Sequence, residues 1–325
     1  MNSALIQVEN VTKVFGKKRF LSREQQGVRA VDSVSLDILP GEVVGLVGES
    51  ACGKSTLGRI FLRLHEPTSG RVLFEGRDIT KLSRSKLVPV RKHIQMIFQD
   101  PYASLNPRMT VRKTIERVLY LHGMPSDRDS IADVLQRCGL NPKLMERYPH
   151  EFSGGQRQRI AIARAIAIKP KFVVCDEPVS ALDTSVQAQV INLLKEFHEN
   201  DGLSYLFISH DLSVVRHISS RIVVMYLGRI VEIQGKKDFF QQPLHPYSEA
   251  LLSSIPIADP ELQRNRKKIK LKGDVQARRD MPGAGCSFFE RCPCSMTVCT
   301  ESRPALKEIA PGSFVACHRA AESVE

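Results

Sequence analysis

The chain has 325 residues, which is enough for one large domain or for a full domain joined to a smaller one. Apolar residues make up 42% and charged residues 25%, as in an ordinary soluble globular protein, and no apolar run of about 18 residues predicts a membrane span. A net charge of +12 and a pI of about 9.4 suit nucleic acid, an anionic membrane surface or phosphate-bearing ligands, without choosing among them. The N-terminus lacks the basic head and apolar segment of a secretory signal, so we expect the protein to stay in the cytosol.

The first elements alternate between apolar runs and breaks. Residues 5–15 alternate loosely and predict a strand, whereas the charged run at 16–27 predicts a solvated hairpin or loop. The apolar stretch 42–47 follows a Pro-Gly pair and predicts a buried strand. A Gly-bearing loop and a helix beginning near Lys54 should follow it.

Later segments repeat the order of strand, loop and helix. Residues 171–177 and 204–210 predict two more buried strands, each followed by a helical pattern. Residues 88–168 are mostly helical in pattern and broken by prolines, so we expect a helical subdomain inserted into an α/β core with a parallel sheet. Residues 222–233 predict a hairpin around Gly228.

The chain is predicted to divide after residue 242. Residues 1–242 form the α/β domain, and residues 243–325 form a C-terminal extension that contains five of the eight cysteines. Six of the nine residues at 264–272 are basic. This stretch is either a solvated linker or a contact for anionic lipid headgroups or an acidic partner.

A complete P-loop pattern runs from Gly48 to Ser55 between a predicted strand and a predicted helix. Backbone N–H groups of such a loop wrap phosphates, and the helix N-terminus adds a partial positive charge. Lys54 should reach the β- and γ-phosphates, and the Ser55 hydroxyl should ligate Mg²⁺. The pattern therefore predicts a nucleotide site.

Two carboxylates end the strand predicted at 171–177. Asp176 is placed to hold Mg²⁺, through water, and Glu177 is placed to polarise the attacking water as a general base. The same pair could simply cap a helix, but the upstream P-loop favours the catalytic interpretation.

A second candidate anion site begins at Ser153, about 100 residues beyond the P-loop. Ser153 is a plausible N-cap, and Gly154 and Gly155 permit close backbone approach. One compact fold cannot readily bring both sites to one ATP. The stretch 152–159 (FSGGQRQR) resembles the signature motif of ABC ATPases, which binds the ATP held by the partner subunit.

Other landmarks of the ABC family stand in the expected order. Gln99 resembles the Q-loop glutamine, Asp183 lies in a stretch that resembles the D-loop, and His210 resembles the switch histidine. Phe15 resembles the aromatic that stacks on adenine, although it could be a core aromatic. Stretches 99–107, 177–189 and 245–247 are similar to the oligopeptide/dipeptide importer ATPases.

The resemblance implies roles for a larger set of residues. The implied catalytic residues are Glu177, His210 and Gln99. The implied Mg²⁺ ligands are Ser55, Gln99 and Asp176. The ATP-binding set is Phe15, Gly48, Glu49, Ser50, Ala51, Cys52, Gly53, Lys54, Ser55 and Thr56, and the set offered to the partner's ATP is Ser153, Gly154, Gly155 and Gln156.

Ala51 departs from the family pattern, which usually has glycine at this place. A positive φ there would cost alanine about 1 kcal/mol. We expect the loop to accept the alanine, because other P-loops carry varied residues there.

The cysteines of the extension, in a segment with a poor apolar core, suggest a metal that helps the segment fold. No CxxC pair marks a zinc site, so an iron–sulfur cluster, zinc and plain reduced cysteines all stay open. The segment resembles the C-terminal motif of the peptide-importer ATPases, which implies a four-iron four-sulfur cluster. Its ligands would be Cys286, Cys292, Cys299 and Cys317, with Cys294 left over.

The resemblance covers essentially the whole chain, which is identified as a member of the family of ATP-hydrolysing subunits of bacterial peptide importers. The resemblance implies a second ABC subunit, most simply a paralogue, together with two membrane permeases and, indirectly, a solute-binding protein. It places the chain peripherally on the cytoplasmic face of the inner membrane, with no nucleic-acid partner. The alternatives are a soluble ABC ATPase that acts on nucleic acid or ribosomes, suggested by the charge, and a non-catalytic cassette.

Overall fold

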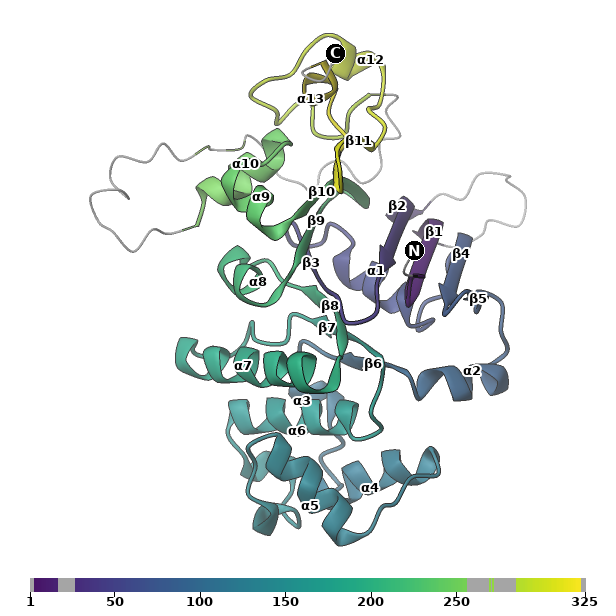
Figure 1. The fold of residues 1–325 in the computed structure, drawn as a ribbon, viewed down its shortest axis with the longest axis vertical. Helices are drawn as coiled ribbons and strands as arrows, with labels where there is room; N and C mark the ends of the chain where they lie inside the picture. Colours follow the sequence, from purple (N-terminus) through teal and green to yellow (C-terminus); the bar gives the residue numbers. More distant parts are fainter. Residues whose placement is uncertain (1–2, 17–26, 256–268, 270, 272–284, 323–325) are drawn as a thin grey trace.

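Residues 3–16, 27–255, 269, 271 and 285–322 are described by the structure, which is a computed structural model. Figure 1 shows an elongated molecule with a helical part at one end, sheets in the middle and the C-terminal elements at the other end. The predictions for most of 16–27 and of the basic stretch 264–272 lie outside the described residues.

The large sheet joins eight strands of the described chain in the order β11-β12-β10-β9-β3-β8-β7-β6. The parallel strands are β3 (Val43–Val47), β6 (Ile94–Ile97), β7 (Phe172–Asp176), β8 (Ser204–Ile208) and β9 (Arg221–Tyr226). The antiparallel strands are β10 (Arg229–Gly235), β11 (Lys307–Ala310) and β12 (Ser313–Val315). Strands β3, β7 and β8 are buried along their whole length, as runs of apolar residues in parallel strands require. The parallel sheet and the hairpin around Gly228 are confirmed.

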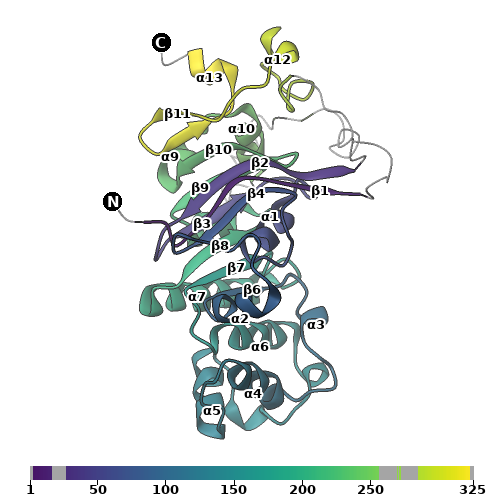
Figure 2. The same ribbon diagram turned by 90° about the vertical axis from the view of Figure 1, so that its right-hand side faces the viewer.

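A second, antiparallel sheet has the order β2-β1-β4-β5. Its strands are β1 (Ile6–Phe15), β2 (Val28–Ile38), β4 (Ser69–Phe74) and β5 (Arg77–Asp78). Helix α1 (Lys54–Phe61) contacts β1 and β2 on one side and β7 and β8 on the other, so it fills the space between the two sheets. Figure 2 shows this arrangement from the side. Only β1 of this sheet was predicted from the sequence.

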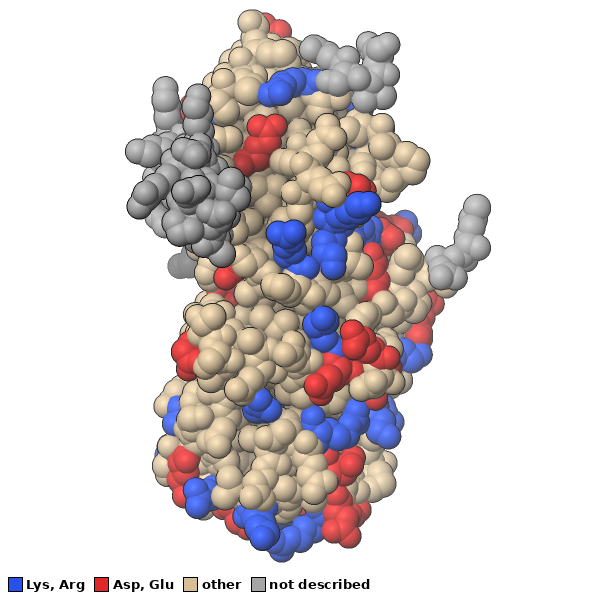
Figure 3. All heavy atoms as spheres, turned by 60° about the vertical axis from the view of Figure 1, so that its left-hand side comes forward, with Lys and Arg blue, Asp and Glu red and all other residues tan. Residues whose placement is uncertain are grey.

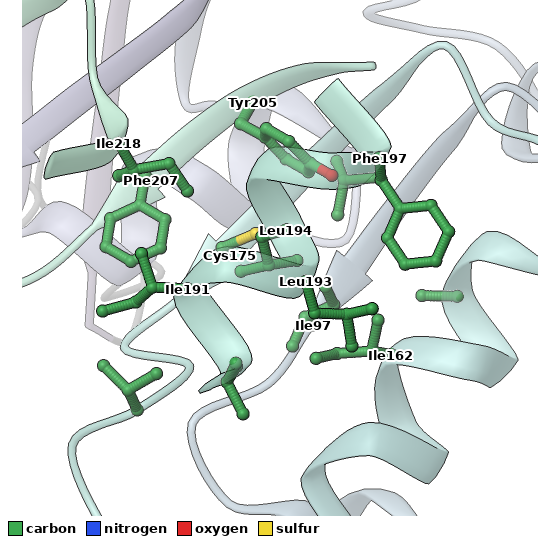
Figure 4. Close-up of a cluster of buried hydrophobic side chains, with 14 of the residues drawn as sticks. Ile97, Ile162, Cys175, Ile191, Leu193, Leu194, Phe197, Tyr205, Phe207 and Ile218 are labelled. Carbon is green, nitrogen blue, oxygen red and sulfur yellow. The ribbon is translucent and has the colours of Figure 1, made fainter. Parts of the chain in front are cut away.

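The opposite face of the large sheet is covered by α6 (Gly154–Ile166), α7 (Thr184–Asp201) and α8 (Leu212–Ile218). In Figure 4, Leu194 of α7 lies beside Cys175 of β7, and Ile191 of the same helix lies beside Phe207 of β8. Leu194, Cys175 and Phe207 are fully buried. This core fixes the carboxyl ends of the strands, where the predicted catalytic residues lie.

The region predicted as a helical subdomain, 88–168, is mostly helical but also contains β6, which pairs with β7 in the large sheet. Besides α6 and the second half of α2 (Arg84–Arg91), its helices are α3 (Pro101–Ser104), α4 (Val111–Leu121), α5 (Arg128–Arg137) and the 3₁₀ turns Pro142–Leu144 and Pro149–Glu151. Thr110 and Asp127 cap α4 and α5 through their side-chain oxygens. The polar residue before each apolar stripe therefore sets where these helices begin.

The C-terminal extension is built onto the large sheet. Its elements are α10 (Pro246–Ser253), α12 (Val298–Glu301), β11, β12 and α13 (His318–Glu322), and they follow α9 (Lys236–Gln241). Strand β12 pairs with β10, and Tyr247 and Phe288 belong to the same apolar core as α7. The division of the chain after residue 242 stays a prediction. The extension shares a sheet and an apolar core with the part of the chain before it.

Among the helices of the described residues, none combines the length and the apolar character needed to cross a membrane.

Leu194→Ala should lower the free energy of unfolding by about 2–5 kcal/mol, because it opens a cavity in the buried layer between α7 and the sheet. Glu196→Ala, on an exposed position of the same helix, should change it by less than about 0.5 kcal/mol. Chemical denaturation of both variants measures the difference. Equal stability of the two would contradict the assigned packing of α7.

Candidate functional site

The P-loop lies between β3 and α1, as predicted. Gly53 caps α1 with a left-handed φ of 108°, and a Cβ there would come within 2.1 Å of the carbonyl oxygen of Ala30. Glycine is therefore required both for the backbone conformation and for the close approach of β2. The P-loop therefore packs closely against β2 at Gly53.

Lys54 is buried, at 4% exposure, in the first turn of α1. Its Nζ donates hydrogen bonds to the carbonyl oxygens of Gly48 and Glu49, both at 2.8 Å. A buried ammonium group must have such partners, because its desolvation is otherwise costly. The lysine is thus held within its own loop, which is the loop predicted to wrap phosphates.

Ser55 and Asp176 bring two oxygen ligands together. The Ser55 hydroxyl donates to Asp176 Oδ1 at 2.7 Å. Burial raises the pKa of Asp176 above its ordinary value, and the bond from Ser55 opposes the rise. A bound cation would reverse the effect of burial, so this pair of oxygens suits a hard cation such as Mg²⁺.

Gln99, Glu177 and His210 converge at the ends of β6, β7 and β8. Gln99 Nε2 donates to Glu177 Oε2 at 3.0 Å, and His210 Nδ1 lies 3.3 Å from the same oxygen. Glu177 has a left-handed φ of 47°, a conformation that costs a non-glycine residue about 1–2 kcal/mol. Such strain persists where the surrounding structure fixes it and is typical of functional sites.

These groups surround one open cavity of about 990 Å³. Its lining is Phe15, Val28, Ala30, Ser50, Ala51, Gly53, Lys54, Ser55, Thr56, Gln99, Asp100, Glu177, Ser180, Ala181 and His210. Phe15 is 40% exposed, and its ring makes an edge-to-face contact with the ring of His65. It is therefore not a core aromatic. The predicted nucleotide residues that line this space thus come from both sheets and from α1.

Ala51 has a φ of 62°, which is in the left-handed region. The loop therefore accepts alanine in the conformation for which a cost of about 1 kcal/mol was predicted.

Ser153 to Gln156 lie outside the cavity lining. Ser153 caps α6: its hydroxyl accepts from the Gln156 N–H at 3.3 Å, and the Gln156 side chain accepts from the Ser153 N–H at 3.0 Å, which makes a capping box. A Cβ on Gly155 would come within 2.4 Å of Val186, whereas one on Gly154 would meet only an ordinary contact. The predicted N-cap is confirmed, and close approach requires glycine at Gly155 alone.

Asp183 caps α7 by accepting from the N–H of Val186 at 3.0 Å and from the hydroxyl of Ser185 at 2.7 Å. It lies on the exposed surface near the cavity residues Ser180 and Ala181 along the chain. The structure thus gives this residue a capping role that the sequence comparison did not assign.

The five cysteines of the extension line one small cavity of about 10 Å³, beside Phe288 and Phe289. Within the described residues, no three or more His, Cys, Asp or Glu side chains are arranged to hold a metal ion. Burial raises the pKa of Cys286, Cys317 and Cys292, the last to about 11, so these thiols are protonated when no metal is bound. The expected metal-binding extension is therefore not supported: the thiols gather, but their geometry does not fit a cluster.

Several lining residues were missed from the sequence. Val28 and Ala30 lie on β2, which was not predicted because it follows the charged loop and its apolar alternation is interrupted. Asp100, Ser180 and Ala181 lie in motifs that the sequence analysis used, but it assigned site roles only to other residues of these motifs. Their closeness in sequence to Gln99 and Glu177 could have predicted that they line the cavity.

Comparison with known proteins matches the description "ABC transporter" to residues 31–180, and "Oligopeptide/dipeptide transporter, C-terminal region" to residues 231–299. The putative oligopeptide transport ATP-binding protein YkfD of Bacillus subtilis is 53% identical over 95% of both chains. The oligopeptide transport ATP-binding protein AppF of the same organism is 51% identical over 97% of both chains.

Solved structures give the same fold. A dimeric post-hydrolysis state of the ATP-binding cassette MJ0796, bound to ADP and Pi, has a TM-score of 0.63 at 29% identity and covers 71% of this chain and 98% of its own. The cbiO1 protein of Clostridium perfringens, part of an ABC transporter complex, has a TM-score of 0.63 at 28% identity and covers 74% and 91%.

Fold and site together define an ABC-type ATPase. The chain belongs to the ABC transporter family, in the branch of ATP-binding subunits of oligopeptide and dipeptide transporters.

Ala51→Gly should raise the free energy of unfolding by about 0.5–1 kcal/mol. It removes a left-handed strain of about 1–2 kcal/mol and adds an unfolded-state entropy cost of about 0.4–1 kcal/mol. Ala132→Gly inside α5 has no strain to relieve and should lower stability by about 1 kcal/mol. Denaturation curves of both variants measure these changes, and a loss of stability in Ala51→Gly would refute the strain.

Proposed function

We propose that the chain hydrolyses ATP to power the import of short peptides through separate membrane subunits. The observation that carries the proposal is the gathering of Lys54, Ser55 and Glu177 around one cavity large enough for a nucleotide, with Asp176 bonded to Ser55 behind the lining. Peptide as cargo is supported by the names of the relatives and by the match of the C-terminal region.

In the proposed reaction, the P-loop holds the phosphates and Lys54 turns its ammonium group to the β- and γ-phosphates. Ser55, Gln99 and Asp176 would hold Mg²⁺, which neutralises charge on the phosphates when it is bound. Glu177 orients the water that attacks the γ-phosphorus in line and accepts its proton. His210, which lies beside Glu177, contacts the γ-phosphate as charge develops.

Two such subunits would close head to tail around two ATPs. Ser153 to Gln156 begin a helix whose N-terminus is exposed and lies outside this chain's own cavity. That position supports a role toward the ATP of a partner subunit, with Asp183 near the same junction. The partner is a second ABC subunit, and a paralogue is the simplest choice.

The remaining partners follow from the family. Closure and opening of the dimer would be passed by Gln99 and the helical region to two permeases on the cytoplasmic face of the inner membrane, which receive cargo from a solute-binding protein. A soluble ATPase acting on nucleic acid or ribosomes is the alternative. On the face shown in Figure 3, basic and acidic side chains are interspersed, and no broad basic surface favours that alternative.

Glu177→Gln should leave ATP binding intact and lower turnover by about 10² or more, because it removes the general base and keeps the shape of the side chain. ATP-bound dimers should accumulate. ATPase assays of the reconstituted transporter and size-exclusion chromatography with ATP measure both effects. Near-normal turnover would remove Glu177 from its role.

Lys54→Ala is the contrasting variant, and it should lose nucleotide affinity itself because the lysine contacts the phosphates of bound ATP as well as of the transition state. Unchanged affinity in an ATP titration would show that the loop does not bind phosphates as proposed.

The iron–sulfur cluster implied by the family motif also stays a proposal. Support comes from the gathering of Cys286, Cys292, Cys299 and Cys317 around one cavity, and the described geometry would have to rearrange to ligate a cluster. The Sγ of Cys294, the cysteine outside the family motif, accepts a hydrogen bond from the side chain of Arg319 at 3.0 Å. The group would cross-link the extension, and no step of hydrolysis uses it.

Protein purified without oxygen should be brown and contain iron and sulfide in roughly equal amounts, as thiolate-bound clusters do. Cys292→Ser should bleach it, and Cys294→Ser should keep the colour. Absorption spectra and metal analysis decide the matter. Stoichiometric zinc would make the site a zinc site, and metal-free protein would leave reduced structural cysteines.

A further inference from the structure

The C-terminal extension reaches the P-loop at Glu49. Arg291 donates two parallel hydrogen bonds to the Glu49 carboxylate, Nη1 to Oε2 at 2.7 Å and Nη2 to Oε1 at 2.9 Å. The Arg291 side chain is only 7% exposed, and its guanidinium also lies 3.4 Å from the Tyr226 hydroxyl. Bidentate pairs of this kind are the strongest and most directional ion pairs in proteins, more so when solvent is excluded.

A second contact from the extension holds the main chain of the same residue. The N–H of Glu49 donates to the hydroxyl of Tyr247 at 2.8 Å. Tyr247 is fully buried, with its ring 4.8 Å from that of Tyr226 and 5.4 Å from that of Phe288. Both side chain and main chain of Glu49 are therefore fixed by residues beyond the catalytic domain predicted from the sequence.

The start of α10 is itself held by a buried network. The Glu232 carboxylate on β10 accepts from the N–H groups of Leu244 at 3.0 Å and His245 at 2.8 Å. His245 Nδ1 accepts from the Tyr247 N–H at 3.0 Å, and burial lowers the pKa of His245 to about 4, so the ring is neutral and free to accept. The Tyr247 hydroxyl is thus placed rigidly from the large sheet.

Glu49 stands at a position where both its charge and its backbone matter for ATP. Its carbonyl oxygen accepts one of the hydrogen bonds that hold Lys54 Nζ, so movement of Glu49 moves the lysine. Glu49 is outside the cavity lining, but an unpaired carboxylate in a loop proposed to wrap polyphosphate would still repel the ligand. Arg291 supplies the neutralising charge.

We propose that Arg291 is a positioning residue of the ATP site: by pairing with Glu49 it neutralises the P-loop carboxylate and fixes the loop, so that ATP affinity depends on the C-terminal extension. The inference rests on the proposed ATP-binding function and adds to it a control of affinity from outside the ATPase core. Arg291 immediately precedes Cys292, so a change at Cys292 takes place next to the residue that pairs with the P-loop.

Titration of the full-length chain with the non-hydrolysable analogue adenylyl imidodiphosphate and Mg²⁺ tests the inference. Arg291→Gln should weaken binding by about 10-fold, because the Glu49 carboxylate of the P-loop is left unpaired and the Glu49 carbonyl that holds Lys54 is less firmly placed. In the reconstituted transporter the KM for ATP should rise by a similar factor, while kcat at saturating ATP should change by less than about twofold, since the reacting groups are untouched.

A double-mutant cycle separates this role from simple folding of the extension. In a Glu49→Gln background, where no carboxylate remains to be neutralised, Arg291→Gln should change the affinity by less than about twofold. Arg303→Gln is the matched control, because Arg303 also lies in the extension but pairs with Asp32 and not with the P-loop. It should leave the affinity unchanged.

Two results would overturn the inference: equal affinity of wild type and Arg291→Gln, or the same loss with and without the Glu49 carboxylate. A lower melting temperature of Arg291→Gln with wild-type affinity would likewise show a purely structural pair. If the proposed ATP-binding function failed, no variant would bind the analogue, and that outcome is distinct from equal binding by all.

Discussion

The ammonium group of Lys54 is buried and bonded to two carbonyl oxygens of its own loop, and the shape of the ATP site depends on this enclosure. A cation can stay buried only where oxygen atoms surround it. The loop must therefore curl back over the start of α1, which requires the left-handed turn at Gly53 and the close approach of β2. The buried strand β3 on one side and α1 between the sheets hold this curl in place.

Two non-glycine residues with left-handed backbones, Ala51 and Glu177, line the same cavity. Each costs about 1–2 kcal/mol, which a fully buried sheet and the helices on its faces can tolerate. The left-handed conformation has a different cause at each position. At Ala51 it belongs to the turn of the P-loop, whereas at Glu177 it places the carboxylate beside Gln99 and His210. The first strain can be removed by glycine, and the second belongs to the proposed chemistry.

The extension looks like an appendage in the sequence, but it completes both the sheet and the P-loop. Strand β12 pairs with β10, Tyr247 and Phe288 fill the core, and Arg291 closes on Glu49. A partly buried, bidentate pair between residues 242 positions apart ties the C-terminal extension to the nucleotide loop. The C-terminal extension therefore contacts the P-loop directly through Arg291 and Tyr247.

The sequence by itself determined the elements whose chemistry is local. The P-loop, the strand that ends in Asp176–Glu177, the N-cap at Ser153 and the parallel core follow from short patterns, because the physical causes of each lie within a few residues. The antiparallel sheet, the φ of Ala51, the geometry of the cysteines and the pairing of Arg291 with Glu49 were decided only by the tertiary structure. Each depends on which distant segments meet, and the strength of an ion pair or the strain of a turn is set by those neighbours.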